Sequence, residues 1–505
     1  MRTRSYFIFF VLLTIITTLN ILPKEKFIPE KFRKYMKSSL AEWNVPGTAV
    51  GIIYDGYIIL AEGFGFRDLE KKLPVDRYTL FPIGSSTKAF TAFVVGKLVE
   101  DKVIGWDDPV KDHLRDFELY DPWVSSRFRV TDLLIHNSGL PRHDLVWYRS
   151  DSSREELVRG LKHLRNNKGF RTSFQYQNLL YMTAGYLCGQ VTGSTWEELV
   201  RKYITDPLKM DGLNFSIEAL EKTDNYSLPY TEKEGKLINV PFYREMQGIG
   251  PAGSINSNVY TMLRWVKLHL DNGKWEGKQV ISERILKTTH TPQFVVGDGM
   301  ILSMLTGFEE LSHPAYGMGW FIQSYRGNTL IHHGGNIDGF SAYVSFMPEI
   351  GAGVIVLTNK NSNLLTMATA FHIYDKLRGK TQIDWNSRLK QAMAERLKIM
   401  AGERAEARKK RKTGEGAHDP AALLAGSYSN GAYGEMVVSA AGGGLQIRFH
   451  KFEGTLKHTG GNDFEVAGSM LEGLAVTFLK DSGGMITGLA APLEPKVDDI
   501  VFTKK

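Results

Sequence analysis

Apolar residues dominate an early segment of the chain in a pattern typical of β-strands. From Thr48 to Phe64 they run on both sides of the dipeptide Asp55-Gly56. These two residues tolerate the positive φ angles of a tight hairpin turn. The sequence therefore predicts a β-hairpin at the start of the fold.

The pattern then changes to helical spacing and later returns to strands. An apolar run from Ala89 to Val99 predicts a helix, and breaks rich in Gly, Pro and Asp separate several further helical segments. The additional predicted helices cover 110–114, 130–135, 155–164, 179–191 and 196–203, and the predicted late strands cover 330–333, 340–347 and 353–358.

This order of elements predicts an α+β fold. We expect an antiparallel sheet flanked by helices, in which the first and last strands meet. The intervening segments predict an inserted all-helical lobe, with a cleft between the lobe and the sheet. Residues 27–388 are expected to form this domain.

A different pattern of short alternating strands occupies the C-terminal part. Glycine-rich turns separate the strands at regular intervals, which predicts a small antiparallel barrel or sandwich over 419–505, and we expect a lipocalin-like β-barrel. Residues 389–418 are polar and basic, and they predict a helical linker that ends in a loop. The predicted strands of the barrel cover 436–439, 445–450, 453–458, 474–479 and 485–489.

The positive charge of the chain is concentrated in this linker. The formal net charge is +7, and residues 388–412 contain ten Lys or Arg and three Glu, which accounts for that excess. The rest of the chain is therefore close to neutral. A nucleic-acid surface would place its basic excess in the folded parts, so we expect no nucleic-acid partner.

The N-terminus predicts export from the cytoplasm. Arg2 and Arg4 precede an apolar run from Tyr6 to Leu22, which is typical of a signal peptide or a membrane anchor in residues 1–22. No small-residue cleavage site follows the run, which favours an uncleaved anchor. We expect an extracytoplasmic protein that is membrane-anchored or secreted.

Cys188 is the single cysteine of the chain. An intramolecular disulfide is therefore excluded, and so is a metal site built from several thiolates. The histidine pair His332-His333 lacks the spaced partners of zinc sites. We expect neither a metal nor an organic cofactor.

The tetrad from Ser85 to Lys88 carries the first sign of chemistry. It follows Gly84 and precedes the predicted helix, and residues i and i+3 of a helix share a face. Lys88 can then lie within hydrogen-bond reach of the Ser85 hydroxyl, as an activated serine requires. A second S-x-x-K match at 387–390 lies in a charged segment without this context.

Two further polar groups precede the helix predicted at 179–191. Tyr176 is a phenol that becomes a base only if a cation such as Lys88 lowers its pKa. Asn178 lies two residues along, where an extended chain returns side chains to the same side. Its amide is expected to bond both Lys88 and a substrate.

A late predicted strand ends in His333-Gly334-Gly335. Alternation along a strand places His333 and Gly335 on one side and His332 on the other, so only one histidine can point into a cleft. The glycines allow a substrate backbone to approach the strand closely.

Together these motifs resemble the serine β-lactamase and penicillin-binding-protein superfamily. The order Ser85-x-x-Lys88, Tyr176-x-Asn178 and then the late His-Gly-Gly motif is similar to the branch of class C β-lactamases, family VIII esterases and D-amino-acid peptidases. Residues 133–141, with the sequence LLIHNSGLP, resemble the L-L-x-H-T-S-G-L motif of that branch.

The resemblance implies roles for the late motif. It implies that His333 faces the cleft, in place of the Lys in the K-T-G form of the family. It also implies that the backbone N–H groups of Ser85 and Asn336 form the oxyanion hole, with Gly334 and Gly335 lining the substrate site. The loop at 136–141 is expected to support the floor of the site.

The expected function is that of an exported serine hydrolase acting through an acyl-enzyme on Ser85. Because a largely neutral histidine replaces the lysine that helps bind β-lactam carboxylates, esters and amides or peptides with D-residues are the preferred small-molecule substrates. The alternatives are a β-lactamase or a penicillin-binding D,D-peptidase, and a non-catalytic membrane-associated scaffold or filament protein. A homo-oligomer is compatible with all of these readings.

Overall fold

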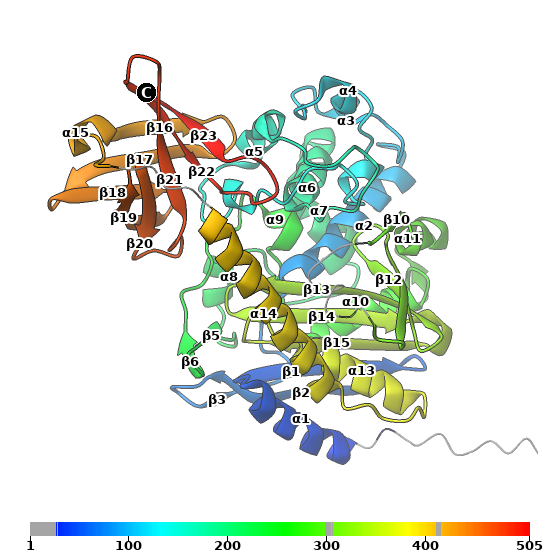
Figure 1. Ribbon diagram of the computed structural model, residues 1–505. Helices are drawn as coiled ribbons and strands as arrows, with labels where there is room; N and C mark the ends of the chain where they lie inside the picture. The colour runs from blue at the N-terminus through cyan, green and yellow to red at the C-terminus, as the bar shows by residue number, and fades with distance from the viewer. Residues whose placement is uncertain (1–26, 28, 298–304, 306, 411–415) are drawn as a thin grey trace, which may run out of the picture.

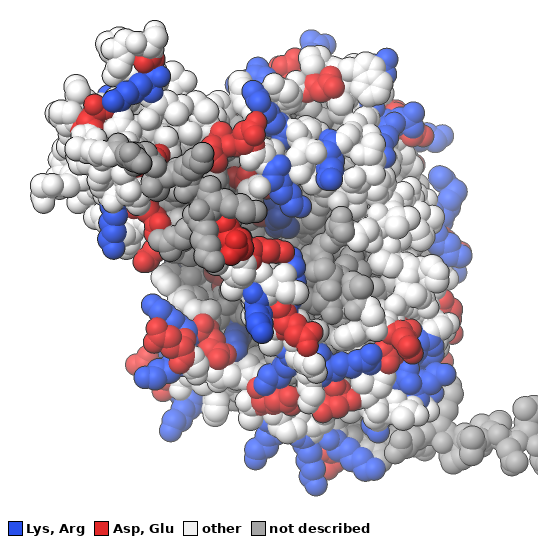
Figure 2. All heavy atoms as spheres, in the orientation of Figure 1, with Lys and Arg blue, Asp and Glu red and all other residues white. Residues whose placement is uncertain are grey.

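A computed structural model describes residues 27, 29–297, 305, 307–410 and 416–505. The chain forms a large α+β domain and a smaller barrel, and a long helix runs between them along one side of the molecule (Figure 1). Lys and Arg side chains are interspersed with Asp and Glu side chains over the face in Figure 2.

The centre of the α+β domain is an antiparallel sheet with the order β10-β11-β12-β13-β14-β15-β1-β2-β3. Its first and last major strands meet, as predicted, because β1 pairs with β15 and Thr48 lies opposite Thr358. The strands are β1 Gly47–Tyr54, β2 Tyr57–Asp68, β3 Leu73–Pro74, β10 Phe294–Val295, β11 Leu311–Tyr316, β12 Phe321–Tyr325, β13 Asn328–Ile337, β14 Phe340–Met347 and β15 Ala352–Thr358.

The predicted N-terminal hairpin is confirmed. Asp55 and Gly56 form the two-residue connection between β1 and β2, with φ angles of 51° and 80°. Two successive positive φ angles give a turn whose twist matches that of the flanking strands. The turn therefore fixes the register of the first two strands.

Helices cover both faces of the sheet. On one face, α1 Pro29–Trp43 and α13 Leu365–Leu377 pack against β1 side chains such as Val50 and Ile52. On the other face, α10 Val259–Leu270 packs against β1 and β15, and α2 Lys88–Glu100 and α11 Glu283–His290 extend that layer. Strand β1 is buried almost throughout, which explains why its sequence is continuously apolar.

The helical lobe is inserted after β4 Phe81–Pro82, before the chain returns to the main sheet at β10. Three of its predicted helices differ from the structure. The segment 130–135 contains only the 3-10 turn η2 Thr131–Leu133, 155–164 changes to the 3-10 turn η4 Leu161–His163 after α5, and 196–203 changes to the π-helical turn η5 Arg201–Thr205 after α7. The lobe helices are α3 Val110–His113, α4 Pro122–Ser125, α5 Arg154–Gly160, α6 Asn178–Thr192, α7 Trp196–Val200, α8 Ile217–Glu221 and α9 Gly250–Gly253.

Short two-stranded pairs and 3-10 turns complete the domain. The pairs are β4 Phe81–Pro82 with β7 Asn256–Ser257, β5 Tyr230–Lys233 with β6 Lys236–Asn239, and β8 Lys274–Trp275 with β9 Lys278–Gln279. The 3-10 turns are η1 Gly84–Thr87, η3 Asp144–Val146, η4 Leu161–His163 and η6 Pro348–Ile350.

The C-terminal part is a closed antiparallel barrel, as the fold prediction required. Alternate side chains point inward and are buried, for example Tyr428, Met436 and Phe502. After the short helix α15 Ala421–Leu424, the strands are β16 Gly426–Asn430, β17 Gly434–Ala441, β18 Gly444–Phe449, β19 Phe452–Gly460, β20 Asp463–Ala467, β21 Ala475–Lys480, β22 Ile486–Ala491 and β23 Ile500–Lys504.

The helix between the two domains is α14, which spans Trp385–Lys410. It begins before the predicted linker, and its first turn belongs to the α+β domain because Trp385 and Leu389 are buried in that core. Among the described residues, no helix combines the length and apolarity needed to cross a membrane. The predicted signal or anchor segment in residues 1–22 lies outside the described residues.

Candidate active site

Ser85 and Lys88 lie at the junction of η1 and α2. In a 3-10 turn, residues three apart lie above one another, and Lys88 Nζ is 3.0 Å from Ser85 Oγ. Ser85 is partly exposed, whereas Ser86, Thr87 and Lys88 are buried. The serine is therefore the member of the tetrad that a substrate can reach.

Lys88 is placed to accept the proton of Ser85. Its Nζ also lies 2.8 Å from the Ala252 carbonyl oxygen and 2.8 Å from Asn178 Oδ1. The Asn178 amide is held in this orientation because its Nδ2 donates to Asp144 Oδ1 at 3.0 Å. The two N–H groups of a neutral amine satisfy these two oxygens, which leaves the nitrogen lone pair for the Ser85 hydroxyl.

The surroundings favour this neutral amine. Lys88 is completely buried, and burial lowers its pKa well below the ordinary value of a lysine. The positive charge of Arg142 lowers the Lys88 pKa further, while the negative charge of Asp144 acts in the opposite direction. The lowered pKa favours the neutral form of Lys88, which is the form that can accept a proton.

Tyr176 lies in the same cluster but in a different protonation state from the one we expected. Its ring centre is 4.9 Å from Lys88 Nζ, and the His136 ring packs against it at 4.3 Å. We expected a lysine cation to lower the pKa of the phenol. Instead burial raises the pKa of Tyr176, and interactions with Ser85 and Arg142 only partly offset this effect. A neutral Lys88 supplies no cation, so the phenol keeps its proton.

The His333 ring faces the cluster, with its centre 6.2 Å from that of Tyr176. Both ring nitrogens are already engaged, since Nδ1 is 2.6 Å from the Gly334 carbonyl oxygen and Nε2 is 3.2 Å from the Tyr316 hydroxyl. Burial lowers the pKa of His333 to about 3, so the ring is neutral. His332 points to the other side of the strand, between Phe321 and Tyr343.

Glycines bring the late strand against the serine. A Cβ on Gly335 would lie 1.8 Å from the Ile83 carbonyl oxygen and 3.2 Å from the Ser85 nitrogen. Gly84 has a φ of 51°, and a Cβ there would lie 2.9 Å from the Asn336 nitrogen. Glycine is therefore required at position 335 because the protein's own backbone approaches it closely. We had expected the approach of a substrate backbone to be the reason. The same approach brings the Ser85 and Asn336 nitrogens into one region, where the oxyanion hole is predicted.

Two charged residues of the site were missed by our sequence reasoning. The Arg142 guanidinium lies 5.1 Å from the Tyr176 ring centre, and its Nε donates to Asp144 Oδ2 at 2.5 Å. Asp144 also accepts the hydrogen bond from Asn178 described above. A signal was available, because the polar triplet Arg142-His143-Asp144 directly follows the LLIHNSGLP motif.

Comparison with known families agrees with this arrangement. The beta-lactamase family matches residues 31–375, which is well over half of the chain and contains each site residue named above. The chain belongs to the beta-lactamase family. Residues 410–504, which include the barrel, match a domain of unknown function, DUF3471.

Relatives of this beta-lactamase-family chain include hydrolases. The unguisins hydrolase ungD' of Aspergillus campestris is 29% identical over 387 residues, which are 71% of this chain and 68% of the relative. The octameric penicillin-binding protein homologue from Pyrococcus abyssi is 23% identical, with a TM-score of 0.63 over 94% of this chain and 100% of that chain. The D-amino acid amidase from Ochrobactrum anthropi is 19% identical, with a TM-score of 0.56 over 74% and 99%. Both structures share the fold.

The lowered pKa of Lys88 predicts the pH dependence of this beta-lactamase-family site. Only the neutral amine can accept the Ser85 proton, so the rate of Ser85 labelling should rise as pH increases through the lowered Lys88 pKa and fall below it. Because the Tyr176 pKa is raised, its deprotonation should cause no change in the neutral range. The titratable and charged groups around Lys88 are Tyr176, Tyr181, His136, His333, Arg142 and Asp144.

The measurement is the rate of labelling by a fluorophosphonate, which reacts with activated serines, over a pH series. We expect labelling to reach its maximum at a pH well below the ordinary range of a lysine. Labelling that begins only near pH ~10, the ordinary range of a lysine, would contradict a neutral Lys88 in the folded protein.

Proposed function

We propose that this protein is an exported serine hydrolase that forms an acyl-enzyme on Ser85. The observation that carries the proposal is the geometry of Lys88. Its two donor positions are taken by Ala252 and Asn178, and its third contact is the Ser85 hydroxyl at 3.0 Å. A buried amine that can only accept at this contact is suited to remove the serine proton.

The proposed reaction begins with proton transfer from Ser85 Oγ to Lys88 Nζ. The oxygen then bonds to the substrate carbonyl carbon, and the backbone N–H groups of Ser85 and Asn336 stabilise the negative oxygen of the intermediate. The bond to the leaving group breaks, and the leaving group takes up a proton. Water then repeats the sequence on the acyl-enzyme, which releases the acid and restores the serine.

Tyr176 is proposed to supply the leaving-group proton. Its phenol is protonated at rest and lies beside both Ser85 and Lys88, so it can donate to the leaving group while Lys88 holds the serine proton. Lys88 then returns that proton to Tyr176, which resets the pair. Asn178 holds Lys88 and keeps one amide N–H for a substrate.

Esters, and amides or peptides containing D-residues, are the proposed substrates. The late motif offers no cation for a β-lactam carboxylate, since the pKa of His333 is lowered to about 3. Among the relatives, one is named as an unguisins hydrolase and a protein of similar fold is a D-amino acid amidase. Export is proposed from the apolar run at Tyr6–Leu22, and a homo-oligomer is a further proposal, supported by the octameric homologue of similar fold.

The test combines active-site labelling with a substrate panel. A fluorophosphonate should add to the peptide that carries Ser85, as read by mass spectrometry, and short acyl esters and D-amino-acid amides should be hydrolysed faster than nitrocefin. Faster nitrocefin turnover would favour a β-lactamase, and a stable penicillin adduct would favour a penicillin-binding D,D-peptidase. No adduct at Ser85 and no turnover, with filaments visible by electron microscopy, would overturn the proposal in favour of a scaffold.

A further inference from the structure

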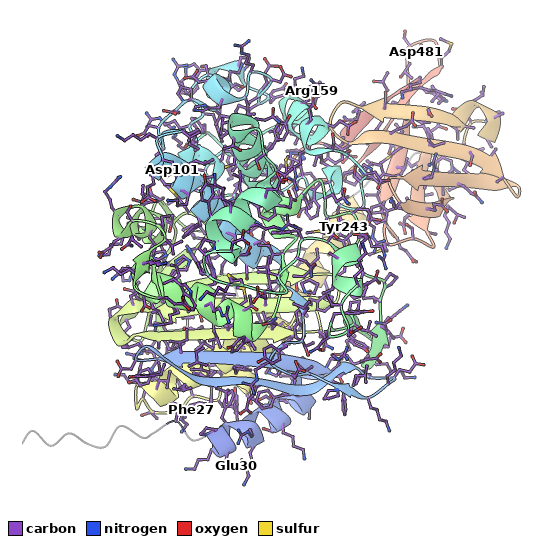
Figure 3. The ribbon with its side chains drawn as sticks, turned by 180° about the vertical axis from the view of Figure 1, so that it is seen from behind. Phe27, Glu30, Asp101, Arg159, Tyr243 and Asp481 are labelled. Atoms are coloured by element: carbon purple, nitrogen blue, oxygen red, sulfur yellow. The ribbon has the colours of Figure 1, made fainter. Side chains whose placement is uncertain are left out.

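The barrel contacts the helical lobe at the segment that follows the LLIHNSGLP motif. His450 of the barrel lies with Nε2 2.9 Å from the Leu145 carbonyl oxygen, and Lys451 Nζ pairs with Asp151 at 2.8 Å. Tyr148 of the lobe packs against Phe452 of the barrel with ring centres 6.0 Å apart, and also against Tyr243, labelled in Figure 3, at 4.9 Å.

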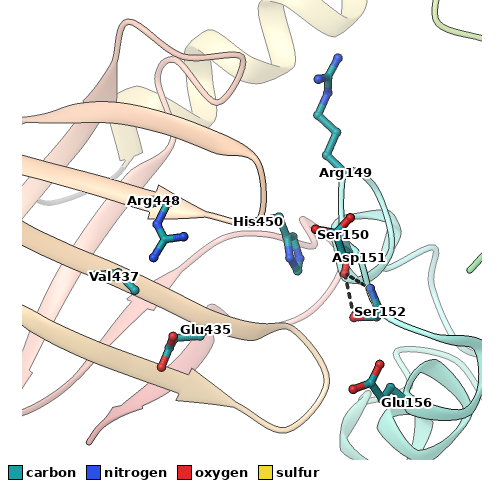
Figure 4. Close-up of a pocket in the computed structure, with 9 residues that line it drawn as sticks. All are labelled: Arg149, Ser150, Asp151, Ser152, Glu156, Glu435, Val437, Arg448 and His450. Carbon is teal, nitrogen blue, oxygen red and sulfur yellow. Dashed lines mark hydrogen bonds between the residues drawn. The ribbon is translucent and has the colours of Figure 1, made fainter. Parts of the chain in front are cut away.

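Much of this contact is an open, polar groove. The groove has a volume of about 390 Å³ and separates barrel strands from the lobe segment, so the two surfaces do not pack continuously there (Figure 4). Its lining residues are Arg149, Ser150, Asp151, Ser152, Glu156, Glu435, Val437, Arg448 and His450. The hydrogen bonds and ion pairs beside the groove therefore help to fix the position of the barrel on the lobe.

The most buried of these contacts converge on His143. Its backbone N–H donates to Glu494 Oε2 of the barrel at 2.8 Å, and its Nδ1 is 2.7 Å from the Tyr433 hydroxyl. Its Nε2 is 3.2 Å from the Arg165 carbonyl oxygen, which can only accept, so Nε2 carries the proton and Nδ1 accepts from Tyr433. His143, Tyr433 and Glu494 are all buried.

His143 also has a strained backbone. Its φ is 46°, in the left-handed region that side chains other than glycine rarely adopt. Such a conformation persists only where the surroundings hold it. Here the barrel provides two of the hydrogen bonds that do so, one to the backbone and one to the ring.

The residues on either side of His143 reach the catalytic cluster. Arg142 lies over the Tyr176 ring, and Asp144 orients the Asn178 amide that holds Lys88. A rotation of the His143 backbone would move both side chains at once.

We propose that Tyr433 and Glu494 of the barrel are positioning residues for the active site and act through His143. This inference rests on the proposed hydrolase function. It gives the C-terminal domain a direct part in catalysis without contact with substrate: the barrel fixes the backbone between Arg142 and Asp144, and these residues fix Tyr176, Asn178 and Lys88.

The test uses the full chain with Tyr433→Phe and Glu494→Leu, which each remove one of the two contacts; a glutamine at 494 would keep an oxygen that accepts from the His143 N–H. The first-order rate of fluorophosphonate labelling at Ser85 should fall about ten- to hundredfold in each variant, the size expected when a supporting residue shifts a catalytic group. The acid limb of the pH profile should move to higher pH. Arg142 lowers the Lys88 pKa more strongly than Asp144 raises it, and the variants would no longer hold Arg142 beside Lys88.

Two control variants make the same chemical changes elsewhere in the barrel. Tyr428 is equally buried, and its hydroxyl bonds the Leu424 carbonyl oxygen at 2.6 Å, within the barrel region. Glu472 is exposed on the barrel surface and does not line the groove. Tyr428→Phe and Glu472→Leu should leave both the labelling rate and its pH profile unchanged.

The outcomes separate the two proposals. Absence of labelling at Ser85 in the unsubstituted protein would overturn the hydrolase function itself. If the unsubstituted protein is labelled, and Tyr433→Phe and Glu494→Leu show the same labelling rate and the same acid limb as that protein, the positioning role alone is overturned. Partial unfolding of a variant would lower the labelling rate without moving the acid limb, so the pH profile, read beside the thermal unfolding temperature, separates a loss of positioning from a loss of folding.

Discussion

Replacing Ser85 by alanine should reduce turnover about 10⁴- to 10⁶-fold and remove all labelling by fluorophosphonate, while the folded structure is retained. The substitution removes Ser85 Oγ, the proposed nucleophile, which lies 3.0 Å from Lys88 Nζ, and alanine offers no group that can replace it. The side chain is small and partly exposed, so its loss leaves little cavity. Measuring turnover, labelling and the thermal unfolding temperature of this variant would separate a loss of catalysis from a loss of folding.

The adjacent serine is the matched control. Ser86 is buried, and its hydroxyl donates to the His333 carbonyl oxygen at 3.1 Å. Ser86→Ala should cost about 1 kcal/mol of folding free energy through that bond and keep activity within about tenfold. Equal losses of activity in Ser85→Ala and Ser86→Ala would contradict the assignment of Ser85 as the nucleophile.

The second large effect is expected at Gly335. Its added Cβ in Gly335→Ala would lie 1.8 Å from the Ile83 carbonyl oxygen, a backbone atom that can move only if β13 and the segment leading to Ser85 separate. We expect a loss of about 3 kcal/mol in the free energy of unfolding, at the high end for an overpacked core site. Labelling of Ser85 should slow about 100-fold, because the serine and the Asn336 nitrogen no longer meet in the same geometry.

The neighbouring glycine again supplies the control. A Cβ on Gly334 would have the Ala342 carbonyl oxygen at 3.6 Å as its nearest neighbour, which is an ordinary contact. Gly334→Ala should therefore change the free energy of unfolding by no more than about 0.5 kcal/mol. Urea unfolding of both variants measures this difference, and equal stabilities would show that the contact of β13 with Ile83 is not close in solution.

Local patterns in the sequence were sufficient for the centre of the sheet, from β13 to β2, but not for β3, β10, β11 and β12, which were not predicted. The apolar runs around Asp55-Gly56 and at 340–358 predicted the hairpin and the late strands, because burial on both faces leaves continuous apolar segments. The barrel was predicted as a class, but β16, β20 and β23 were not, since segments such as Gly426–Asn430 are short and carry few apolar residues.

The site was predictable where its chemistry follows a motif, and less so where it depends on three-dimensional surroundings. The structure brings Ser85, Lys88, Tyr176 and Asn178 together, yet the protonation state of the tyrosine could not be read from residue types. It depends on burial and on the charge of Arg142, which the fold supplies. The contribution of Tyr433 is equally hidden, since nearly 300 residues of sequence separate it from His143.

The pairing of β1 with β15 also has a consequence for biosynthesis. The N-terminal hairpin leaves the ribosome early, but its partner edge, from Ala352 to Thr358, is made some 300 residues later. Until then the backbone N–H and C=O groups along one edge of β1 have no partner strand and can pair with other nascent chains. We therefore expect yield of this protein to depend on chaperones that shield newly made chains, and to fall sharply when translation stalls before residue 358.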